Sequence, residues 1–196
     1  MLHRCGWEGS APDYVAYHDT EWGVPEYDPR TLWEKLVLDG FQAGLSWITI
    51  LRKRDAFRAA FAGFDPLAVA AFTDVDVNRL LADPGIIRHR GKIEATITNA
   101  RAYLEVNATL GFDKFLWNYV DGVPLQTNFS SRDQVPPKTE LSEQVSKDLR
   151  AHGFKFVGPT IVYAFMEATG LVNDHITPCF RHAECAAMGR RAEGAQ

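Results

Sequence analysis

The chain has 196 residues, of which 46% are hydrophobic and 23% are charged. This length suits one domain or two closely packed lobes, and this composition excludes a mainly disordered chain. A formal net charge of −4 argues against a nucleic-acid partner unless the basic residues are segregated on one face.

No apolar run approaches the length of a membrane-spanning helix, and the N-terminal residues lack the apolar stretch of a secretory signal. We therefore expect a cytoplasmic protein without a membrane partner. The three cysteines are Cys5, Cys179 and Cys185. An odd number in a reducing compartment favours free thiols or metal ligands over disulfides.

Helix signals dominate the first 120 residues. The pairs Asp28-Pro29 and Asp65-Pro66 each place a capping aspartate before a proline at the first helical position. Ser46 is expected to cap a further helix, with Gly63 just past its end. Apolar residues recur at helical spacing, and no segment alternates as a half-buried strand would. The sequence therefore predicts an all-α fold.

Basic residues gather in three stretches, at 52–58, 88–92 and 147–155. If these stretches share one face, they form a strip that would attract phosphate groups. The alternative is that each is the solvated face of a separate helix. Charge alone does not decide the partner.

The C-terminal third begins with a long loop, at 121–138, and continues with a helical segment that starts near Thr139. Two short helices, within about 141–170, meet through a turn at Val157-Gly158. Such a turn leaves backbone N–H groups that can hold a phosphate, and Lys155 adds charge beside it. An ordinary helix-turn-helix of the core is the equal alternative. We expect residues 1–180 to form one domain and 181–196 a flexible tail.

Four potential metal ligands stand near the two ends of the chain, namely Cys5, His18, His175 and Cys179. Two thiols and two imidazoles suit tetrahedral zinc, and with all four positions filled the ion would be structural. Such a site would tie the chain ends together. Packed histidines and inert buried thiols remain the alternative, and His182 and Cys185 are further candidates.

Five blocks carry a resemblance to a known family: YHDTEWGVP at 17–25, GFQAGLSW at 40–47, GIIRHRGKI at 85–93, GFKFVG at 153–158 and GLVNDH at 170–175. They resemble the 3-methyladenine DNA glycosylase I family of the helix-hairpin-helix superfamily, over about residues 5–179. The resemblance implies an enzyme that flips N3-methyladenine out of double-stranded DNA containing alkylated purines and hydrolyses its N-glycosidic bond. It implies a structural zinc ion on the four ligands above and no nucleotide cofactor.

The resemblance also assigns roles by position. The aromatic residues that would surround the base are Trp7, Tyr14, Tyr17, Trp22 and Trp47. The positions that would face DNA are Gln42, Gly44 and Leu45 in one loop, and Lys155, Val157, Gly158 and Thr160 in the hairpin. Asp39 is expected to hydrogen-bond the base and is the candidate catalytic residue. It stands where the family usually has glutamate, which is longer by one methylene.

Three further positions bear on the chemistry. Bifunctional members of the superfamily carry a nucleophilic lysine where this chain has Thr160, so strand-cleaving lyase activity is not expected. Near the superfamily's usual catalytic aspartate this chain has Asn173, so no strong general base is assigned. Asp174 is expected to support the zinc ligand His175 instead.

Two other functions remain open. A zinc-dependent hydrolase of small molecules would need an open metal position for water. A non-catalytic, zinc-stabilised DNA-binding protein would leave the aromatic residues and Asp39 without a role. Nothing in the sequence requires more than a monomer.

Overall fold

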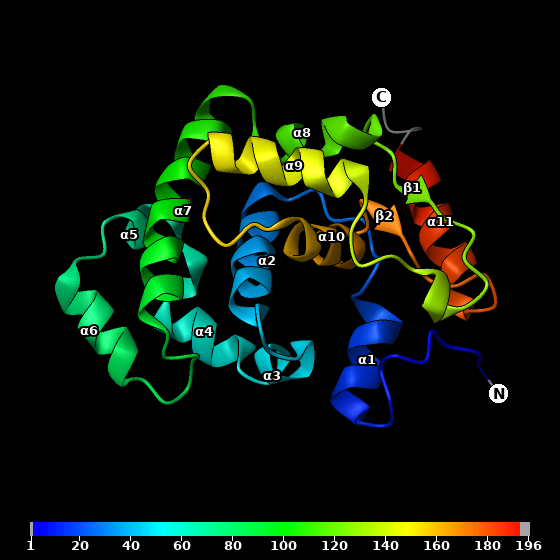
Figure 1. Ribbon diagram of the computed structural model, residues 1–196, viewed down its shortest axis with the longest axis horizontal. Helices are drawn as coiled ribbons and strands as arrows, with labels where there is room; N and C mark the ends of the chain where they lie inside the picture. The colour runs from blue at the N-terminus through cyan, green and yellow to red at the C-terminus, as the bar shows by residue number, and fades with distance from the viewer. Residues whose placement is uncertain (1, 193–196) are drawn as a thin grey trace.

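The computed structural model describes residues 2–192, which are almost entirely helical (Figure 1). The α-helices are α1 (Pro12–Thr20), α2 (Pro29–Gln42), α3 (Trp47–Leu51), α4 (Arg54–Ala60), α5 (Pro66–Ala70), α6 (Asp74–Ala82), α7 (Arg90–Thr109), α8 (Phe112–Trp117), α9 (Glu140–Ala151), α10 (Pro159–Ala168) and α11 (Phe180–Ala192). Short 3-10 helices are η1 (Ala62–Phe64), η2 (Asn118–Val120) and η3 (Arg132–Gln134), and the strands are β1 (Leu125–Gln126) and β2 (Val172–Asn173). The helical fold class is thus confirmed, with one addition. The two strands pair in parallel and fasten the loop before α9 to the segment after α10.

Side-chain caps start several helices as the sequence predicts. Asp28 accepts a hydrogen bond from the Thr31 N–H at the start of α2, and Asp65 caps α5 in the same way. Thr139 caps α9 through the N–H of Ser142. Each cap satisfies a backbone donor that the first helical turn leaves without a partner.

The prediction for the helix after Ser46 was wrong in two respects. The Ser46 hydroxyl bonds the Thr49 hydroxyl rather than a backbone N–H, and the expected single helix is divided into α3 and α4. The break falls at Arg52 and Lys53, and both side chains form hydrogen bonds with groups in other segments of the chain. Arg52 bonds Asp13, and the Lys53 ammonium bonds backbone carbonyls of residues 84 and 85.

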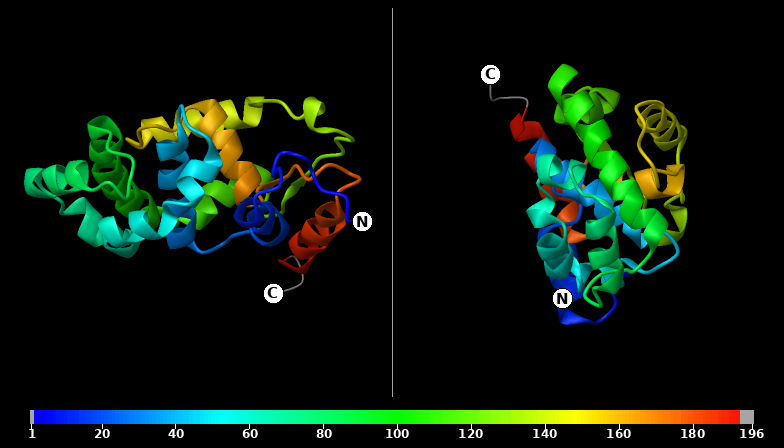
Figure 2. Two further views of the ribbon diagram at one scale, coloured as in Figure 1. Left: turned by 90° about the horizontal axis from the view of Figure 1, so that it is seen from below. Right: turned by 90° about the vertical axis from the view of Figure 1, so that its left-hand side faces the viewer.

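Helices α2 and α10 pack against each other at the centre of the molecule, with α9 beside α10 (Figures 1 and 2). The long helix α7 contacts α2, α5 and α6. One continuous hydrophobic core runs from Tyr17 to Val172 across these helices, so the two lobes expected from the sequence share it. Among the described residues, no helix has both the length and the apolar character needed to cross a bilayer.

The hairpin turn between α9 and α10 sits directly on α2. A Cβ atom at Gly40 would lie 3.4 Å from the Phe156 carbonyl oxygen, so the turn and the helix are in van der Waals contact here. Asn99 of α7 holds the turn from the other side, because its amide group bonds both the N–H and the carbonyl of Lys155. The turn is therefore fixed next to the end of α2 that carries Asp39.

The predicted flexible tail is a helix over most of its length. Residues 180–192 form α11, and the remaining residues, 193–196, lie outside the described part of the chain. Arg181 and Cys185 are buried in this helix, and Asn173 donates to the His182 carbonyl. Burial of one face, which the sparse apolar pattern did not reveal, explains why the segment is ordered.

Candidate functional site

The four predicted ligands, two from each end of the chain, come together in a buried cluster. Their ligand atoms all lie within 4.8 Å of one another. The Cys5 Sγ is 3.4 Å from the His175 Nδ1, and the Cys179 Sγ is 3.6 Å from both the His18 Nε2 and the His175 Nδ1. Tetrahedral zinc would separate sulfur and nitrogen ligands by about 3.5 Å, from its usual bond lengths. The spacing of these residues fits that ion.

Both histidines are oriented by their second ring nitrogen. The His18 Nδ1 lies 2.8 Å from Asp19, which in turn forms a bidentate pair with Arg4. The His175 Nε2 lies 2.9 Å from the Trp22 carbonyl oxygen. The other ring nitrogens, the His18 Nε2 and the His175 Nδ1, face the thiols. Metal-binding histidines are usually oriented in this way, by a hydrogen bond from the nitrogen that does not bind the metal.

This geometry corrects one expectation. Asp174 does not support His175, because the Trp22 carbonyl fills that position. The Asp174 carboxylate instead accepts a 2.6 Å hydrogen bond from the Tyr163 hydroxyl. Asn173 is fully buried and bonds Gln126 and the His182 carbonyl, which is a structural role.

The thiol groups of the cluster are electrostatically coupled. Hydrogen bonds from Cys5, and then from His175 and His18, lower the pKa of the Cys179 thiol. The same interaction with Cys179, together with burial, raises the pKa of Cys5. Thiolate and imidazole are the donor groups that a borderline-soft metal ion such as zinc prefers.

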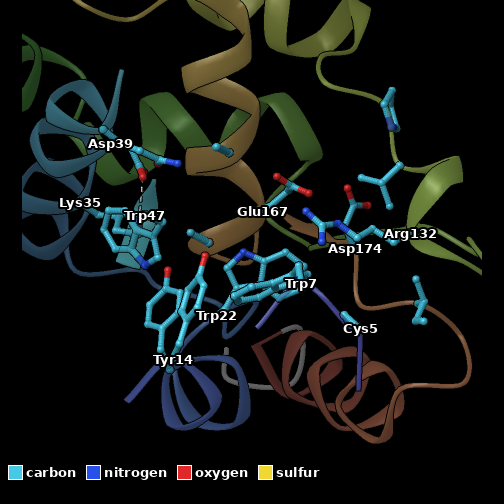
Figure 3. A pocket seen from close by; sticks show the side chains of 17 residues that line it. Cys5, Trp7, Tyr14, Trp22, Lys35, Asp39, Trp47, Arg132, Glu167 and Asp174 are labelled. Carbon is cyan, nitrogen blue, oxygen red and sulfur yellow. Dashed lines mark hydrogen bonds and ion pairs between the residues drawn. The ribbon is translucent and has the colours of Figure 1, made fainter. Parts of the chain in front are cut away.

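Directly beside the cluster lies a cavity of about 340 Å³ (Figure 3). All five aromatic residues assigned from the sequence line it, together with Asp39 and Gln42. Trp7 is the centre of the group, since its ring centroid lies 5.0 Å from those of both Tyr14 and Trp22. Tyr17 connects the group to Trp47 at 5.5 Å. A cavity of this size accommodates a purine.

The cluster and the cavity share a wall. Cys5 and Ile176 line the cavity and belong to the small hydrophobic group around the ligands. The Trp22 ring packs edge-on against His175 with centroids 4.6 Å apart. A Cβ atom at Gly23 would come within 2.8 Å of the His175 Nε2, so only glycine lets the chain pass here.

Several polar atoms in the cavity wall are buried and, among the described residues, have no hydrogen-bond partner. They are the indole N–H groups of Trp7 and Trp47, the Asp39 Oδ2 and the Asp174 Oδ1. Leaving a buried donor or acceptor unmet costs about 1–3 kcal/mol. Two donors and two acceptors without partners, on residues that line one cavity, therefore indicate a polar ligand.

Asp39 lies near the C-terminal end of α2 and forms a salt bridge with Lys35, which is one helical turn earlier. The Lys35 ammonium lies 2.9 Å from the Asp39 Oδ1 and 3.4 Å from the centroid of the Trp47 ring. Burial raises the pKa of Asp39 and lowers that of Lys35, while their mutual attraction opposes both shifts. The sequence analysis did not assign Lys35 to the site, although its spacing from Asp39 puts both on one helix face.

Three other charged residues line the cavity without having been assigned to it. They are Arg132 from η3, Glu167 from α10 and Asp174 after β2. Burial, followed by the neighbouring Asp174, raises the pKa of Glu167. A charged residue in the otherwise apolar helix α10 was the signal that sequence reasoning overlooked.

The positions expected to face DNA lie on two neighbouring segments. Gly44 and Leu45 are exposed in the loop after α2, and this loop is held by the buried Lys92 ammonium, which bonds the carbonyls of residues 41 and 43. In the hairpin turn Lys155 and Thr160 are exposed and Gly158 is half-buried, whereas the Val157 side chain is in the core. Val157 therefore offers only its backbone to a ligand.

Comparison with known proteins gives one consistent result. The profile of the family described as Methyladenine glycosylase matches residues 7–182. The chain is 52% identical to DNA-3-methyladenine glycosylase 1 of Escherichia coli (strain K12), over 91% of this chain and 96% of that protein. A crystal structure of a 3-methyladenine DNA glycosylase I superposes with a TM-score of 0.90 at 55% identity, covering 92% of this chain and 100% of the other. A single-residue variant of such an enzyme in complex with 3-methyladenine gives 0.89 at 40% identity, with coverage of 91% and 97%.

Proposed function

The chain belongs to the methyladenine glycosylase family, and from this premise we propose that it removes N3-methyladenine from alkylated double-stranded DNA by hydrolysing the N-glycosidic bond. The observation that carries the proposal is the set of buried, unpartnered polar atoms around an aromatic cavity. This reaction is the first step of base-excision repair, and the DNA substrate accords with the cytoplasmic location expected from the sequence.

The cavity is complementary to a methylated adenine. An adenine edge presents an exocyclic amine, which donates, and ring nitrogens, which accept. The Asp39 Oδ2 is an acceptor for the amine, and the indole N–H groups of Trp7 and Trp47 are donors for the ring nitrogens. The aromatic faces suit a delocalised cation once water is excluded. We assign Asp39 as the catalytic residue because it contacts the reacting base.

The chemistry needs little acid or base assistance. Methylation at N3 gives the base a positive charge and weakens its bond to deoxyribose, so the base leaves as a neutral molecule. A water molecule supplies the oxygen that replaces the base at the sugar. The protein contributes selection of the base, its orientation and exclusion of bulk solvent. Thr160 provides no amine for a Schiff base, and we therefore propose a monofunctional enzyme without lyase activity.

Access to the base requires extrusion of the nucleotide from the helix, which costs less at a damaged pair. Leu45 is exposed three residues after Gln42, which lines the cavity, and we assign Leu45 as the wedge that fills the gap. The turn at 153–158 surrounds a surface hollow, and we propose that this helix-hairpin-helix element holds a phosphate through backbone N–H groups and Lys155. One bound duplex and one active monomer suffice for this arrangement.

The cluster of Cys5, His18, His175 and Cys179 is proposed to hold a structural zinc ion. When bound, the ion would supply cross-linking of the two chain ends and no reactive group. Four protein ligands leave no position for water, which speaks against the alternative of a zinc-dependent small-molecule hydrolase. The residues around the ion form one wall of the base cavity and thereby set its shape.

The proposal is tested by incubating the purified protein with methylated duplex DNA and identifying the released bases by chromatography. We expect release of N3-methyladenine without strand cleavage, and weaker release by Asp39→Asn. A folded, metal-loaded protein that binds the duplex but releases no methylated base would instead be a non-catalytic DNA-binding relative.

A further inference from the structure

Lys35 occupies the two features that would otherwise attract a cationic base. Its ammonium is 2.9 Å from the Asp39 Oδ1 and lies over the Trp47 ring, 3.4 Å from the centroid. A second aromatic ring, that of Tyr17, is 6.0 Å away. A carboxylate and an indole face are the partners that a buried cation requires. The protein has therefore placed its own cation in that position.

The pairing removes Asp39 as a source of net charge. A carboxylate that balances an ammonium one helical turn away presents a neutral unit to anything that enters the cavity. The Asp39 Oδ2 still offers a lone pair to the exocyclic amine of the base. Asp39 can thus position the base by a hydrogen bond but cannot select a positive base over a neutral one.

Glu167 is the carboxyl group left to make that selection. It projects into the cavity from α10, on the wall across from Asp39 and Lys35 (Figure 3). No salt bridge from a described lysine, arginine or histidine neutralises it, in contrast to Asp39. Resting on the function proposed above, we propose that Glu167 is a second base-contacting carboxyl, and that it, rather than Asp39, makes this pocket select the positively charged methylated base.

The electrostatic surroundings support this role. Burial and the neighbouring Asp174 raise the pKa of Glu167, with Arg132 acting in the opposite direction. A carboxyl group in such a position is costly to ionise alone and much less costly beside a cation. Entry of the positive base then favours the carboxylate, with the proton passing to solvent, whereas normal adenine provides no such compensation.

The test measures single-turnover release of N3-methyladenine from a duplex with one such lesion. It also measures affinity for the same duplex carrying the uncharged analogue 3-deaza-3-methyladenine. The variants are Glu167→Gln, Asp39→Asn and the double variant Lys35→Met/Asp39→Asn. Glu105→Gln, at an exposed position of α7, is the matched control. The wild-type rate establishes the glycosylase activity, so failure of that activity is recognised separately.

We expect Glu167→Gln to slow release by about 10- to 100-fold, the range for loss of a charge-assisted hydrogen bond. Its affinity for the uncharged analogue should stay within about twofold, since size and hydrogen-bonding shape are kept. Asp39→Asn should also be slow, because it leaves Lys35 as an uncompensated cation in the cavity. The double variant removes that cation and should recover to within about fivefold of wild type, which is the coupling expected of a contacting pair.

Three results overturn the inference. The first is a Glu167→Gln enzyme that releases the base within twofold of the wild-type rate. The second is a double variant that stays as slow as Asp39→Asn, since this would make the Asp39 carboxylate the selecting charge. The third is a Glu167→Gln enzyme whose affinity for the uncharged analogue falls as much as its release rate, which would assign this residue to cavity shape.

Discussion

The cysteine–histidine cluster and the aromatic cavity share a wall, but their polar atoms are bonded differently. In the cluster, each histidine has one nitrogen bonded to an outer partner and the other directed at the thiols. In the cavity, two indole N–H groups and two carboxylate oxygens are buried, and no described residue bonds them. The ring nitrogens of the cluster are thus bonded within the protein, whereas these cavity groups are not bonded by any described residue.

This difference separates stability from function at neighbouring positions. Loss of a group in the cluster breaks interactions that the folded chain already makes. Loss of an unpartnered group in the cavity removes an interaction that only the bound base makes. Substitutions on the two sides of the shared wall should therefore have different consequences.

The largest effect is expected from removal of the metal. Treatment with a strong chelator, or Cys179→Ser, should lower the melting temperature by about 10 °C or more, because a structural ion contributes directly to folding. Zinc content and thermal unfolding are the measurements. Cys185→Ala, a buried cysteine outside the ligand set, should keep one equivalent of zinc. The prediction fails if the purified protein contains no metal and its melting temperature does not change with chelator.

A smaller effect is expected at Trp47. Trp47→Phe keeps an aromatic ring and removes an N–H that has no partner in the empty cavity, so affinity for free 3-methyladenine should fall about tenfold. The melting temperature should change by at most about 4 °C. Fluorescence titration with 3-methyladenine measures the affinity, and Trp33→Phe is the control. Trp33 also has an unpartnered indole N–H, but it lies outside the cavity, so base affinity should not change there.

The hairpin turn is proposed to make a third kind of contact, to the DNA backbone. Lys155→Ala should weaken duplex binding about three- to fivefold and reduce the salt dependence by about one counterion, because one phosphate contact is lost. Binding isotherms at several salt concentrations give both values. Methylated and unmodified duplexes should be affected equally. A selective loss for the methylated duplex would show that Lys155 acts on base recognition.

The smallest effect is expected at the start of α2, the helix that carries Lys35 and Asp39. Asp28→Ala removes the cap and should destabilise the protein by about 1 kcal/mol in denaturant unfolding. Release of the base should be unchanged, because the first turn of α2 is far along the helix from Asp39. Slower release would mean that loss of the cap at the start of α2 also shifts Asp39 at its other end.

Much of the scaffold followed from local signals in the sequence. The caps at Asp28 and Asp65 are chemical features of single residues and were predicted correctly, as was the start of a helix near Thr139. The meeting of Cys5 and Cys179, and the shared cavity of the five aromatic residues, were expected from the family resemblance. Their geometry matches that expectation, while their functional roles remain predictions.

Other features depend on tertiary contacts that no local pattern records. The break between α3 and α4 contains neither proline nor glycine, and its residues Arg52 and Lys53 bond partners that are distant in sequence. Lys35 and Glu167 each carry a weak sequence signal, but only the packing of α2 against α10 places both beside one cavity. The order of α11 likewise follows from burial of Arg181 and Cys185.

Closure of two distant segments onto one cluster also limits when they can pack during synthesis. Cys5 and His18 are translated long before His175 and Cys179. Trp7 and Trp22 therefore lack their packing partner Ile176 until that residue has been translated. The wall that the cluster and the cavity share is completed only when both segments are present.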